Sequence, residues 1–446
     1  MKVALIAMSG VRAANEELTA VGLTLPGFVE RSRVIASLPS LSLLTLAALT
    51  PREHEVQYFE VRDLRADDPL PADFDLIAIT SFTAQIKDAY VLANRFRAAG
   101  VPVIMGGLHA TVLPDEAAQH CDAVAVGEGE LLWRQILDDA GRGDLRRRYT
   151  VADRDEFDLA DAPVPRYDLL DIDRYNRLTV QTSRGCPFRC EFCASSILLT
   201  TKYKTKPVER VLAEIRAIKD LWDDPFIEFA DDNSFVRRPQ ARRLLAALAR
   251  ERIRWFTECD VSIADDPQLL DLMRESGCRQ VLIGLESPNR SGLDGVEQRG
   301  NWKLRQRDRY EWAVRTIQSY GISVNGCFVL GLDGDDERVF EDVYDFVDRT
   351  GLYEVQATVM TPFPGTPLYG RLLAEGRIIR PCAWDMCTLF DVNYIPRRMS
   401  PERLQRGLID LATRLYDRDF IKDRRQRFFR GVREAHRTRE IEEQAA

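Results

Sequence analysis

Three cysteines with close, unequal spacing are the residues of this chain that most clearly indicate chemistry. Cys186, Cys190 and Cys193 form a CxxxCxxC run. Three thiolates this close together can bind one corner of an iron–sulfur cluster, which usually takes four cysteines. Either a distant fourth ligand or an iron left open for a substrate would complete such a site. The spacing argues against zinc, whose binding sequences normally join two short pairs across a longer stretch.

The length and composition indicate a globular protein of two or three domains. The chain has 446 residues, of which 45% are apolar and 30% charged, and its net charge of -8 gives no reason to expect nucleic acid as the main partner. The apolar run at residues 1–8 is too short for a signal peptide or a membrane span and is expected to form a strand. Nine scattered cysteines do not indicate a disulfide framework, so a reducing cytoplasm is the expected location.

Residues 1–150 alternate short apolar runs with stretches of helical character. The predicted strands are residues 3–8, 56–59, 76–79, 103–105 and 123–126, and the predicted helices are 41–49, 86–98 and 130–139. This alternation predicts a doubly wound parallel sheet, in which ligands bind beyond the carboxyl ends of the strands.

The loops after these predicted strands are rich in glycine and hydroxyl residues. They are Ser9-Gly10 and residues 80–83, 106–111 and 127–130. Such residues let a ligand approach backbone amides closely. One glycine loop can be only a tight turn, but four on one edge favour a ligand site. The segment contains no GxGxxG and no Walker sequence, which disfavours a dinucleotide or a nucleoside triphosphate.

Four stretches of this segment, residues 39–49, 75–81, 106–111 and 127–130, together resemble the cobalamin-binding domain that precedes some radical SAM domains. The DxHxxG motif, whose histidine ligates cobalt in many cobalamin enzymes, is absent, as it commonly is in the radical SAM relatives. His109 is therefore expected to contact the corrin periphery or to be an ordinary loop histidine, and the lower axial position stays unassigned. The resemblance implies cobalamin contacts at Thr80, Ser81, Gly106, Gly107, His109, Thr111, Gly127 and Glu128.

A second β/α rhythm follows a charged, proline-bearing linker at residues 151–175. Predicted strands at 178–182, 226–230, 254–258, 279–284, 322–330 and 354–360 alternate with predicted helices at 207–221, 238–251, 266–276, 303–319 and 338–350. Residues 176–370 are thus expected to form a whole or partial parallel barrel, whose chemistry lies at the carboxyl ends of the strands. The cysteine run follows the first of these strands.

The cysteine run, with Phe192 directly before its last cysteine, resembles the hallmark of the radical SAM superfamily. The resemblance implies a [4Fe–4S] cluster in which three irons bind Cys186, Cys190 and Cys193. The fourth iron then takes the amino and carboxylate groups of S-adenosyl-L-methionine (SAM), and the reduced cluster cleaves SAM to a 5′-deoxyadenosyl radical.

The resemblance also implies SAM contacts at the ends of later strands. Asp232 follows the second strand, Glu286 and Ser287 follow the fourth, and Gly331 follows the fifth. Glu286 is expected to hold the ribose hydroxyls, with a solvated loop carboxylate as the alternative. For Asn233, beside Asp232, an Asx turn that caps the next helix is an equal alternative.

The remaining cysteines and the carboxyl-terminal residues have simpler interpretations. Cys121, Cys259, Cys278 and Cys327 are expected to be small buried side chains, and Cys382 and Cys387 are too few for a second cluster. Residues 371–446 form a helical region in which the apolar positions from residue 404 to 416 should pack on the barrel. The basic stretch beyond residue 420 is expected to be a solvated helix, with a helix lying on an anionic membrane surface as the alternative.

The two resemblances together cover about the first 370 residues and imply a cobalamin-dependent radical SAM methyltransferase that acts on an unactivated carbon. As they imply, the adenosyl radical takes a hydrogen from a small-molecule or lipid-like substrate, and methylcobalamin supplies the methyl group. An external flavodoxin or ferredoxin type protein is the expected electron donor.

Other functions fit the sequence less well. Cyclisation, oxidation or rearrangement without net methyl transfer is the main alternative. A methylthiotransferase is disfavoured because residues 1–150 offer only Cys121 and no basic RNA-binding module closes the chain. A non-catalytic cobalamin- or metal-binding sensor would leave the loops of the predicted barrel unexplained.

Overall fold

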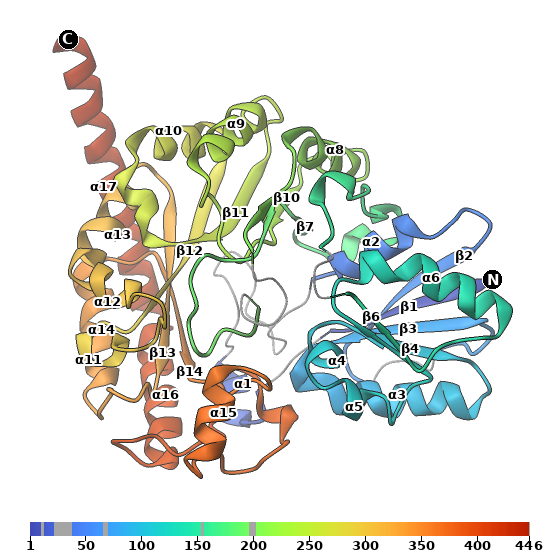
Figure 1. Ribbon diagram of the computed structural model, residues 1–446. Coiled ribbons are helices and arrows are strands. Elements are labelled where there is room, and N and C mark those ends of the chain that lie inside the picture. Colours follow the sequence, from blue (N-terminus) through green and yellow to red (C-terminus); the bar gives the residue numbers. More distant parts are fainter. Residues whose placement is uncertain (10–12, 22–37, 66–69, 153–155, 196–201, 446) are drawn as a thin grey trace.

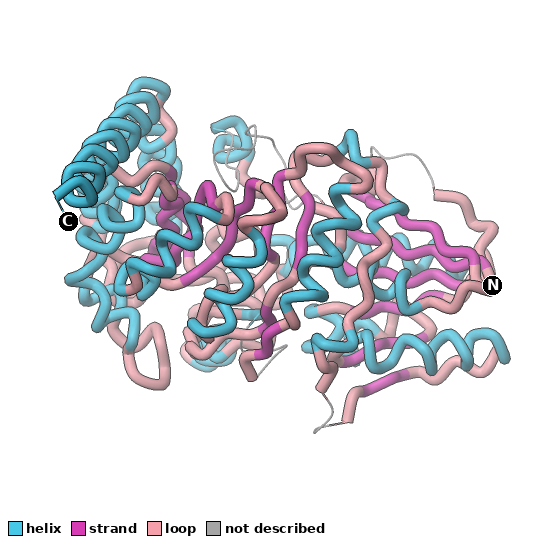
Figure 2. The backbone as a smooth tube through the Cα atoms, turned by 90° about the horizontal axis from the view of Figure 1, so that it is seen from above, coloured by secondary structure: helices cyan, strands magenta, loops and turns pink. Residues whose placement is uncertain are grey.

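The chain folds around two six-stranded parallel sheets, which lie side by side in the computed structural model (Figure 1). The structure describes residues 1–9, 13–21, 38–65, 70–152, 156–195 and 202–445. The two termini lie at opposite ends of the molecule (Figures 1 and 2). The fold class predicted from the sequence is therefore confirmed.

The first sheet has the strand order β2-β1-β3-β4-β5-β6, with every pair parallel. Its strands are β1 (Lys2–Met8), β2 (Glu55–Val61), β3 (Leu76–Ser81), β4 (Val103–Gly106), β5 (Ala123–Val126) and β6 (Arg148–Thr150). The prediction missed β6 because this strand has three residues, of which only Tyr149 is buried. It carries no apolar run that a pattern could reveal.

Helices cover both faces of this sheet, as expected for a doubly wound fold. They are α2 (Leu41–Leu49) and α6 (Gly129–Arg142) on one face and α3 (Ile86–Ala98), α4 (Leu108–Val112) and α5 (Pro114–Ala117) on the other. Strand β1 shows why both faces must be covered, since side chains alternate along a strand. Val3 and Leu5 pack with α2 and α6, whereas Ala4 and Ile6 pack with α3.

The second sheet has the order β14-β13-β12-β11-β10-β7 and is also parallel throughout. Its strands are β7 (Leu178–Val180), β10 (Phe226–Phe229), β11 (Arg254–Cys259), β12 (Cys278–Glu286), β13 (Ser323–Leu330) and β14 (Glu354–Val359). Strands β7 and β14 form the two edges, so the barrel is partial. A short antiparallel pair, β8 (Ser183–Arg184) and β9 (Lys204–Thr205), flanks the cysteine run.

Helices run between these strands on the outside of the partial barrel (Figure 1). They are α8 (Val208–Lys219), α9 (Arg238–Leu248), α10 (Pro267–Glu275), α11 (Arg290–Leu293), α12 (Trp302–Gln306), α13 (Tyr310–Ser319) and α14 (Val339–Thr350). The single helix predicted at 303–319 is wrong in one respect, because a 3-10 turn at Arg307–Arg309 separates α12 from α13. Trp302 at the start of α12 stacks on Phe188 of the cysteine run, whereas α13 packs on the barrel.

The carboxyl-terminal region closes over the barrel and reaches the first sheet. It contains α15 (Pro367–Ala374), the 3-10 turn η7 (Trp384–Met386), α16 (Pro401–Leu415) and α17 (Arg418–Ala445). Helix α1 (Glu16–Val21), from the amino-terminal region, contacts α16. The predicted packing face of α16 is confirmed, since Leu404, Leu408, Leu411 and Leu415 are all buried.

Helix α17 runs along the outer side of the barrel beside α13 (Figure 1). Its arginines point to barrel groups: Arg424 is buried, and Arg427 binds the side chain and the carbonyl of Asp348. Arg439 stacks on the ring of Tyr320. These contacts favour packing of α17 on the barrel over the membrane-surface alternative. In the part of the chain that the structure describes, no helix has the length and apolar content to cross a bilayer.

Replacing Arg424 with Met should lower the free energy of unfolding by about 2–4 kcal/mol, because the carbonyls of Leu352 and Leu415 would lose buried charged donors. Urea denaturation followed by circular dichroism measures the change. Arg430 on the same helix is exposed, so Arg430→Met is the matched control and should stay within about 0.5 kcal/mol of the native value. Equal effects of the two substitutions would contradict this packing.

Candidate active site

The cysteine loop starts from a buried carboxylate. Asp231, after β10, accepts hydrogen bonds from the backbone N–H groups of Thr182 and Ser183 at 2.8 and 2.9 Å and from both hydroxyls. Ser234 also donates to Asp231, at 2.9 Å. Burial raises the pKa of Asp231, and these hydrogen bonds oppose that rise. The carboxylate therefore fixes the direction in which the chain leaves β7.

The next two residues hold the loop itself. Asp232 accepts from the N–H of Gly185 at 2.7 Å and from the hydroxyl of Ser195, so it binds both flanks of the cysteine run. The Asn233 amide donates to Cys186 Sγ at 3.7 Å and to Asp260 at 3.0 Å. Helix α9 begins at Arg238, without a side-chain cap. The Asx-turn alternative for Asn233 is therefore wrong, because its side chain faces the cysteine loop.

The opposite side of the loop rests on residues 296–302. The carbonyl of Val296 accepts from the N–H of Glu191 at 2.9 Å, and the Glu297 carboxylate accepts from four backbone N–H groups, including those of Arg189 and Trp302. The ring of Phe188 stacks on Trp302 with 4.2 Å between centroids. The loop is thus held from both sides before any cofactor binds.

The three predicted cluster ligands lie together within this frame. Burial raises the pKa of Cys190 to about 12, although the charge of Lys303 opposes the rise. Burial likewise raises the pKa of Cys186, against hydrogen bonds from the Phe188 N–H and the Asn233 amide. Among the described residues no three Cys, His, Asp or Glu side chains share a single-ion site. A cluster does not need one, because each thiolate binds a different iron. Three cysteines on one loop held by side chains from both sides fit that requirement.

Glu286 is held in an unusual backbone conformation beside a buried lysine. Its φ is +62°, and its carboxylate accepts from Lys303 Nζ at 2.8 Å. Lys303 also donates to the Gly284 carbonyl at 2.5 Å. Burial acts to lower the pKa of Lys303, but the Glu286 carboxylate and the Cys190 thiol keep it raised. The alternative of a solvated loop carboxylate is therefore wrong: Glu286 is buried and ion-paired.

The two other predicted SAM contacts have packing roles in the structure. Ser287 is buried, and its hydroxyl accepts from the N–H of Asn289 at 3.1 Å. Gly331 has φ +81° and packs against Tyr394 and Leu404, leaving no room for a Cβ. The Gly331 carbonyl accepts from the Tyr394 hydroxyl at 2.7 Å. Phe192 is half-buried and packs on the barrel core.

Carboxylates gather inside the barrel end near the cysteines. Burial, together with the charges of Glu228, Asp232 and Asp231, raises the pKa of Glu258 to about 8. A site in which one carboxyl keeps its proton at neutral pH has an excess of negative charge. SAM carries a sulfonium and an ammonium group, so the barrel end fits this cationic cofactor.

Gly107, in the loop after β4, lies at the carboxyl edge of the first sheet. Gly107 has φ +93° and ψ -173°, and the Thr80 hydroxyl lies 2.5 Å from where a Cβ would stand. Two buried polar atoms here, Ser9 Oγ and Gln85 Oε1, have no hydrogen-bond partner among the residues that the structure describes. The amide side chains around the corrin ring would supply such partners, so this edge fits cobalamin. Gly10 lies outside the described residues.

The other predicted residues of this edge support its loops. The Ser81 hydroxyl donates to the Phe82 carbonyl at 2.8 Å, and the Thr111 hydroxyl accepts from the N–H of Gly127 at 3.1 Å. A Cβ on Gly106 would be in ordinary contact with Ala125. These side chains fix the shape of the edge, and contacts from them to a ligand stay a prediction.

His109 is buried with both ring nitrogens engaged. Nδ1 lies 3.3 Å from the Thr83 hydroxyl and Nε2 lies 3.3 Å from Glu116. Burial lowers the pKa of His109, while Glu116 opposes the shift. Trp384 packs edge-on against the imidazole and donates its own N–H to Glu116 at 3.0 Å. His109 thus has a structural role at the start of α4, where both ring nitrogens face protein partners.

Glu128 joins the two sheets. Its carboxylate accepts from Arg184 at 2.6 Å, from the N–H of Phe157 at 2.7 Å and from Lys204 at 3.3 Å. The other arm of Arg184 binds Glu130 at 2.7 Å. Burial acts to lower the pKa of Arg184, but the carboxylates of Glu130 and Glu128 keep it above its ordinary value. Arg184 thereby ties the loop after β5 to the cysteine loop, at a position two residues before Cys186.

Sequence patterns did not reveal the residues that position the others. Lys303, Arg184 and Gln85 reach the site from an outer helix, a two-residue strand and a helix start. No motif or periodicity marks such residues, because their partners come from distant parts of the chain. Glu128 and Asp232 did stand out in the sequence, but as ligand contacts. The structure shows Glu128 in an ion pair with Arg184 and Asp232 bonded to the flanks of the cysteine run.

The six cysteines outside the run behave mostly as expected. Cys121, Cys259, Cys278 and Cys387 are buried, and Cys327 is half-buried with its thiol 3.6 Å from the Gln356 side-chain oxygen. Cys382 is exposed and has φ +58°. Burial raises the pKa of Cys387 to about 12, so this thiol is a poor nucleophile.

Comparison with known families assigns both sheets. Residues 180–347 match the radical SAM superfamily, and residues 35–137 match the B12 binding domain. Residues 366–445 match a domain of unknown function, DUF4070. The second sheet therefore belongs to a radical SAM domain and the first to a B12 binding domain, as the cysteine run and the glycine loops predict.

Known proteins are similar to this chain over most of its length. The bacteriochlorophyllide d C-12(1)-methyltransferase of Chlorobaculum tepidum is 29% identical over 394 residues, or 86% of this chain and 84% of that protein. The anaerobic magnesium-protoporphyrin IX monomethyl ester cyclase of Cereibacter sphaeroides is 25% identical over 78% of this chain and 60% of its own length.

A solved structure shares the fold of the whole chain. The radical S-adenosylmethionine methyltransferase TsrM of Kitasatospora setae, with cobalamin and a [4Fe-4S] cluster bound, superposes with a TM-score of 0.65 at 15% identity. The match covers 94% of this chain and 89% of TsrM. The chain therefore belongs to the radical SAM superfamily and carries an amino-terminal B12 binding domain.

Proposed function

We propose that this enzyme transfers a methyl group to an unactivated carbon of a small or lipid-like molecule. The observation that carries the proposal is the ion pair of Arg184 with Glu128 and Glu130, which joins the cysteine loop to the loop after β5. A radical source on one loop and a methyl source on the other would then act on one substrate. Methyltransferases among the relatives support the same activity.

In this proposal Cys186, Cys190 and Cys193 hold the cluster. When bound, the cluster and SAM supply the 5′-deoxyadenosyl radical, and cobalamin supplies the methyl group. The protein's own contribution is to orient these groups. Asp232 and Asn233 keep the cysteine loop in place, and the buried thiols must lose their protons when iron binds.

Glu286 is proposed to hold the ribose of SAM. Lys303 pairs with one carboxylate oxygen, Oε1, and thereby orients the other toward the barrel end. The carboxylate of Asp232, one of the charges that raise the pKa of Glu258, would face the positive groups of SAM. Gly331 is proposed to contact adenine through its backbone, since Tyr394 and Leu404 fill the space on its side-chain face.

Cobalamin is proposed to lie on the carboxyl edge of the first sheet. Thr80, Ser81, Gly106, Gly107, Thr111 and Gly127 would line its backbone contacts, with Ser9 and Gln85 as hydrogen-bonding side chains. We assign no cobalt ligand to the chain, because His109 is engaged by Thr83 and Glu116.

We propose domain limits at residues 1–150 for the cobalamin-binding domain, 151–175 for the linker, 176–370 for the barrel and 371–446 for the carboxyl-terminal region. Strand β6 ends at Thr150 and β7 begins at Leu178, which supports the linker. An external flavodoxin or ferredoxin type protein is proposed as the electron donor, because cleavage of SAM consumes one electron.

The proposed methyl transfer can be tested on a mixture of candidate substrates. Extracts of small molecules and lipids would be incubated anaerobically with the loaded enzyme, a reductant and SAM that carries a trideuterated methyl group. Mass spectrometry should find a compound that gains one CD₃ group in place of a hydrogen. A product that loses hydrogens and gains no label would instead identify cyclisation or oxidation, the alternative that the cyclase relative favours.

Replacing Cys190 with Ala should abolish formation of 5′-deoxyadenosine, because the cluster would lose one of its three protein ligands. Cobalamin binding should remain, since the cobalamin edge belongs to another sheet. Chromatography of the nucleoside and absorbance of bound cobalamin measure the two properties. The buried Cys259 is a matched control, and Cys259→Ala should keep both. Loss of both properties in the Cys190 variant would contradict separate cofactor sites.

Replacing Glu286 with Gln should raise KM for SAM about tenfold or more, because one charge-assisted pair of hydrogen bonds to the ribose is weakened. Steady-state 5′-deoxyadenosine formation at varied SAM measures the change. Glu251 is a matched control, since it is buried and ion-paired with Arg216 on the outer helices. An unchanged KM in the Glu286 variant, or an equal rise after Glu251→Gln, would refute the assignment.

Replacing Gly107 with Ala should weaken cobalamin binding about 5- to 100-fold. Its backbone conformation is essentially restricted to glycine, and an added Cβ would displace the Thr80 hydroxyl. Equilibrium dialysis followed by absorbance measures the affinity. Gly143 also has a positive φ but has nothing within 4 Å of its Cβ position, so Gly143→Ala controls for strain alone. Native affinity in the Gly107 variant would exclude this loop from the cobalamin site.

A further inference from the structure

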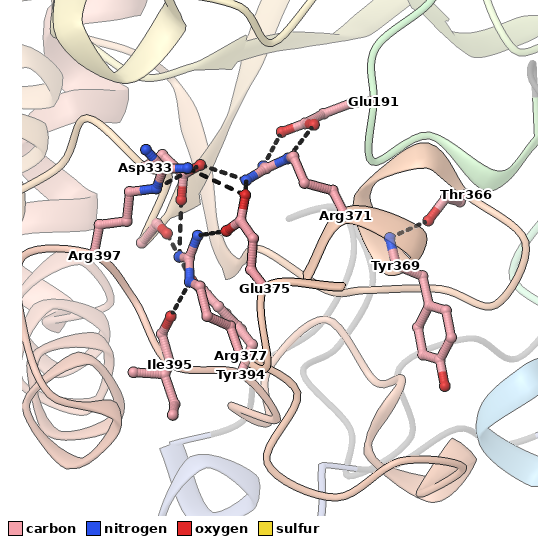
Figure 3. Close-up of polar contacts among 11 residues, drawn as sticks. Glu191, Asp333, Thr366, Tyr369, Arg371, Glu375, Arg377, Tyr394, Ile395 and Arg397 are labelled. Atoms are coloured by element: carbon pink, nitrogen blue, oxygen red, sulfur yellow. Dashed lines mark hydrogen bonds and ion pairs between the residues drawn. The ribbon is translucent and has the colours of Figure 1, made fainter. Parts of the chain in front are cut away.

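An arginine of the carboxyl-terminal region binds the cysteine loop. Arg371, on α15, donates two parallel hydrogen bonds to Glu191, from Nη2 at 2.7 Å and from Nε at 3.1 Å (Figure 3). Glu191 stands directly after Cys190 in the sequence. The backbone adds a third tie, because the N–H of Leu368 donates to the Glu191 carbonyl at 3.1 Å. Bidentate pairs of this kind are geometrically specific as well as strong.

Arg371 is itself held by other charges. Its Nη1 donates to Asp333 at 2.7 Å, and Asp333 also pairs with Arg377 at 2.8 Å and Arg397 at 3.3 Å (Figure 3). Burial tends to raise the pKa of Asp333, but Arg377 and Arg371 hold it below its usual range. Asp333 lies just after β13, next to the Gly331 loop. One guanidinium thus joins the cysteine loop, the β13 loop and the carboxyl-terminal region.

The Glu191–Arg371 pair is shielded from solvent. The side chains are 15% and 28% exposed, whereas many other ion pairs of the chain involve side chains that are about half exposed. A shielded charge that loses its partner costs more than an exposed one, so the loop should respond when either side chain is removed. The same region also reaches the first sheet, where Trp384 donates to Glu116 and Lys87 pairs with Asp385 at 2.5 Å.

We propose that Arg371 is a positioning residue for the cluster and that the region matching the domain of unknown function clamps the cysteine loop against the cobalamin-binding domain. The proposal rests on the assignment of Cys190 as a cluster ligand. In this proposal Arg371 acts on the cysteine loop through Glu191. The carboxyl-terminal region then has a defined task, namely to keep the loop that holds the cluster in one position relative to both sheets.

A double-mutant cycle tests this role. Arg371→Gln, Glu191→Gln and the double variant would be reconstituted with iron and sulfide, and the rate at which a chelator removes iron would be measured. Each single variant should lose iron at least about threefold faster than the native enzyme, and the double variant should be no faster than the singles. The electron paramagnetic resonance spectrum of the reduced cluster, with and without SAM, should change in the same way in all three.

The control is another bidentate pair between the carboxyl-terminal region and the barrel. Arg414 binds Glu341 at 2.7 and 2.9 Å, far in sequence from the cysteine loop, so Glu341→Gln should leave iron loss and the spectrum unchanged. Native rates in the Arg371 and Glu191 variants, additive effects in the double variant, or an equal effect of Glu341→Gln would each overturn the proposal. If the native enzyme itself assembled no cluster, the cluster assignment would fail instead, which separates the two ideas.

Discussion

The two ion pairs of Arg184, with Glu128 and with Glu130, are the contact on which the relative position of the two sheets depends. They join two sheets that have separate hydrophobic cores, and they do so two residues before Cys186. Charges with little solvent exposure tolerate few alternative positions, because any displacement leaves one of them without its partner. These ion pairs thereby fix the cysteine loop relative to the loop after β5 at the carboxyl edge of the first sheet.

Other polar contacts of the site also hold the cysteine loop and the first sheet in place. Asp231 fixes the start of the cysteine loop, and Glu297 supports its far side. Trp384 carries the carboxyl-terminal region onto the first sheet, beside His109. Radical chemistry makes this rigidity useful, since a carbon radical reacts with whatever lies nearest. A misplacement of about 1 Å can cost a hundredfold in such reactions.

The sequence predicted the helices and strands more closely than the contacts between them. Helix Leu41–Leu49 and strand Ala123–Val126 follow from apolar periodicity, which acts over a few residues. Tyr149 in β6 gave no pattern because that strand is too short. Glu128 was predicted as a ligand contact and is an ion-pair partner of Arg184, which stands 56 residues later. Pairings across such separations arise from the packing of two domains, which local patterns do not encode.

The central claim is that one chain places a cluster and a cobalamin next to each other. Pulsed electron paramagnetic resonance on protein loaded with both, each in its paramagnetic reduced state, tests this claim most directly. Neighbouring spins should show a dipolar splitting that disappears when either cofactor is omitted. Two superimposed spectra without interaction, from protein that holds both cofactors in full amount, would contradict this arrangement.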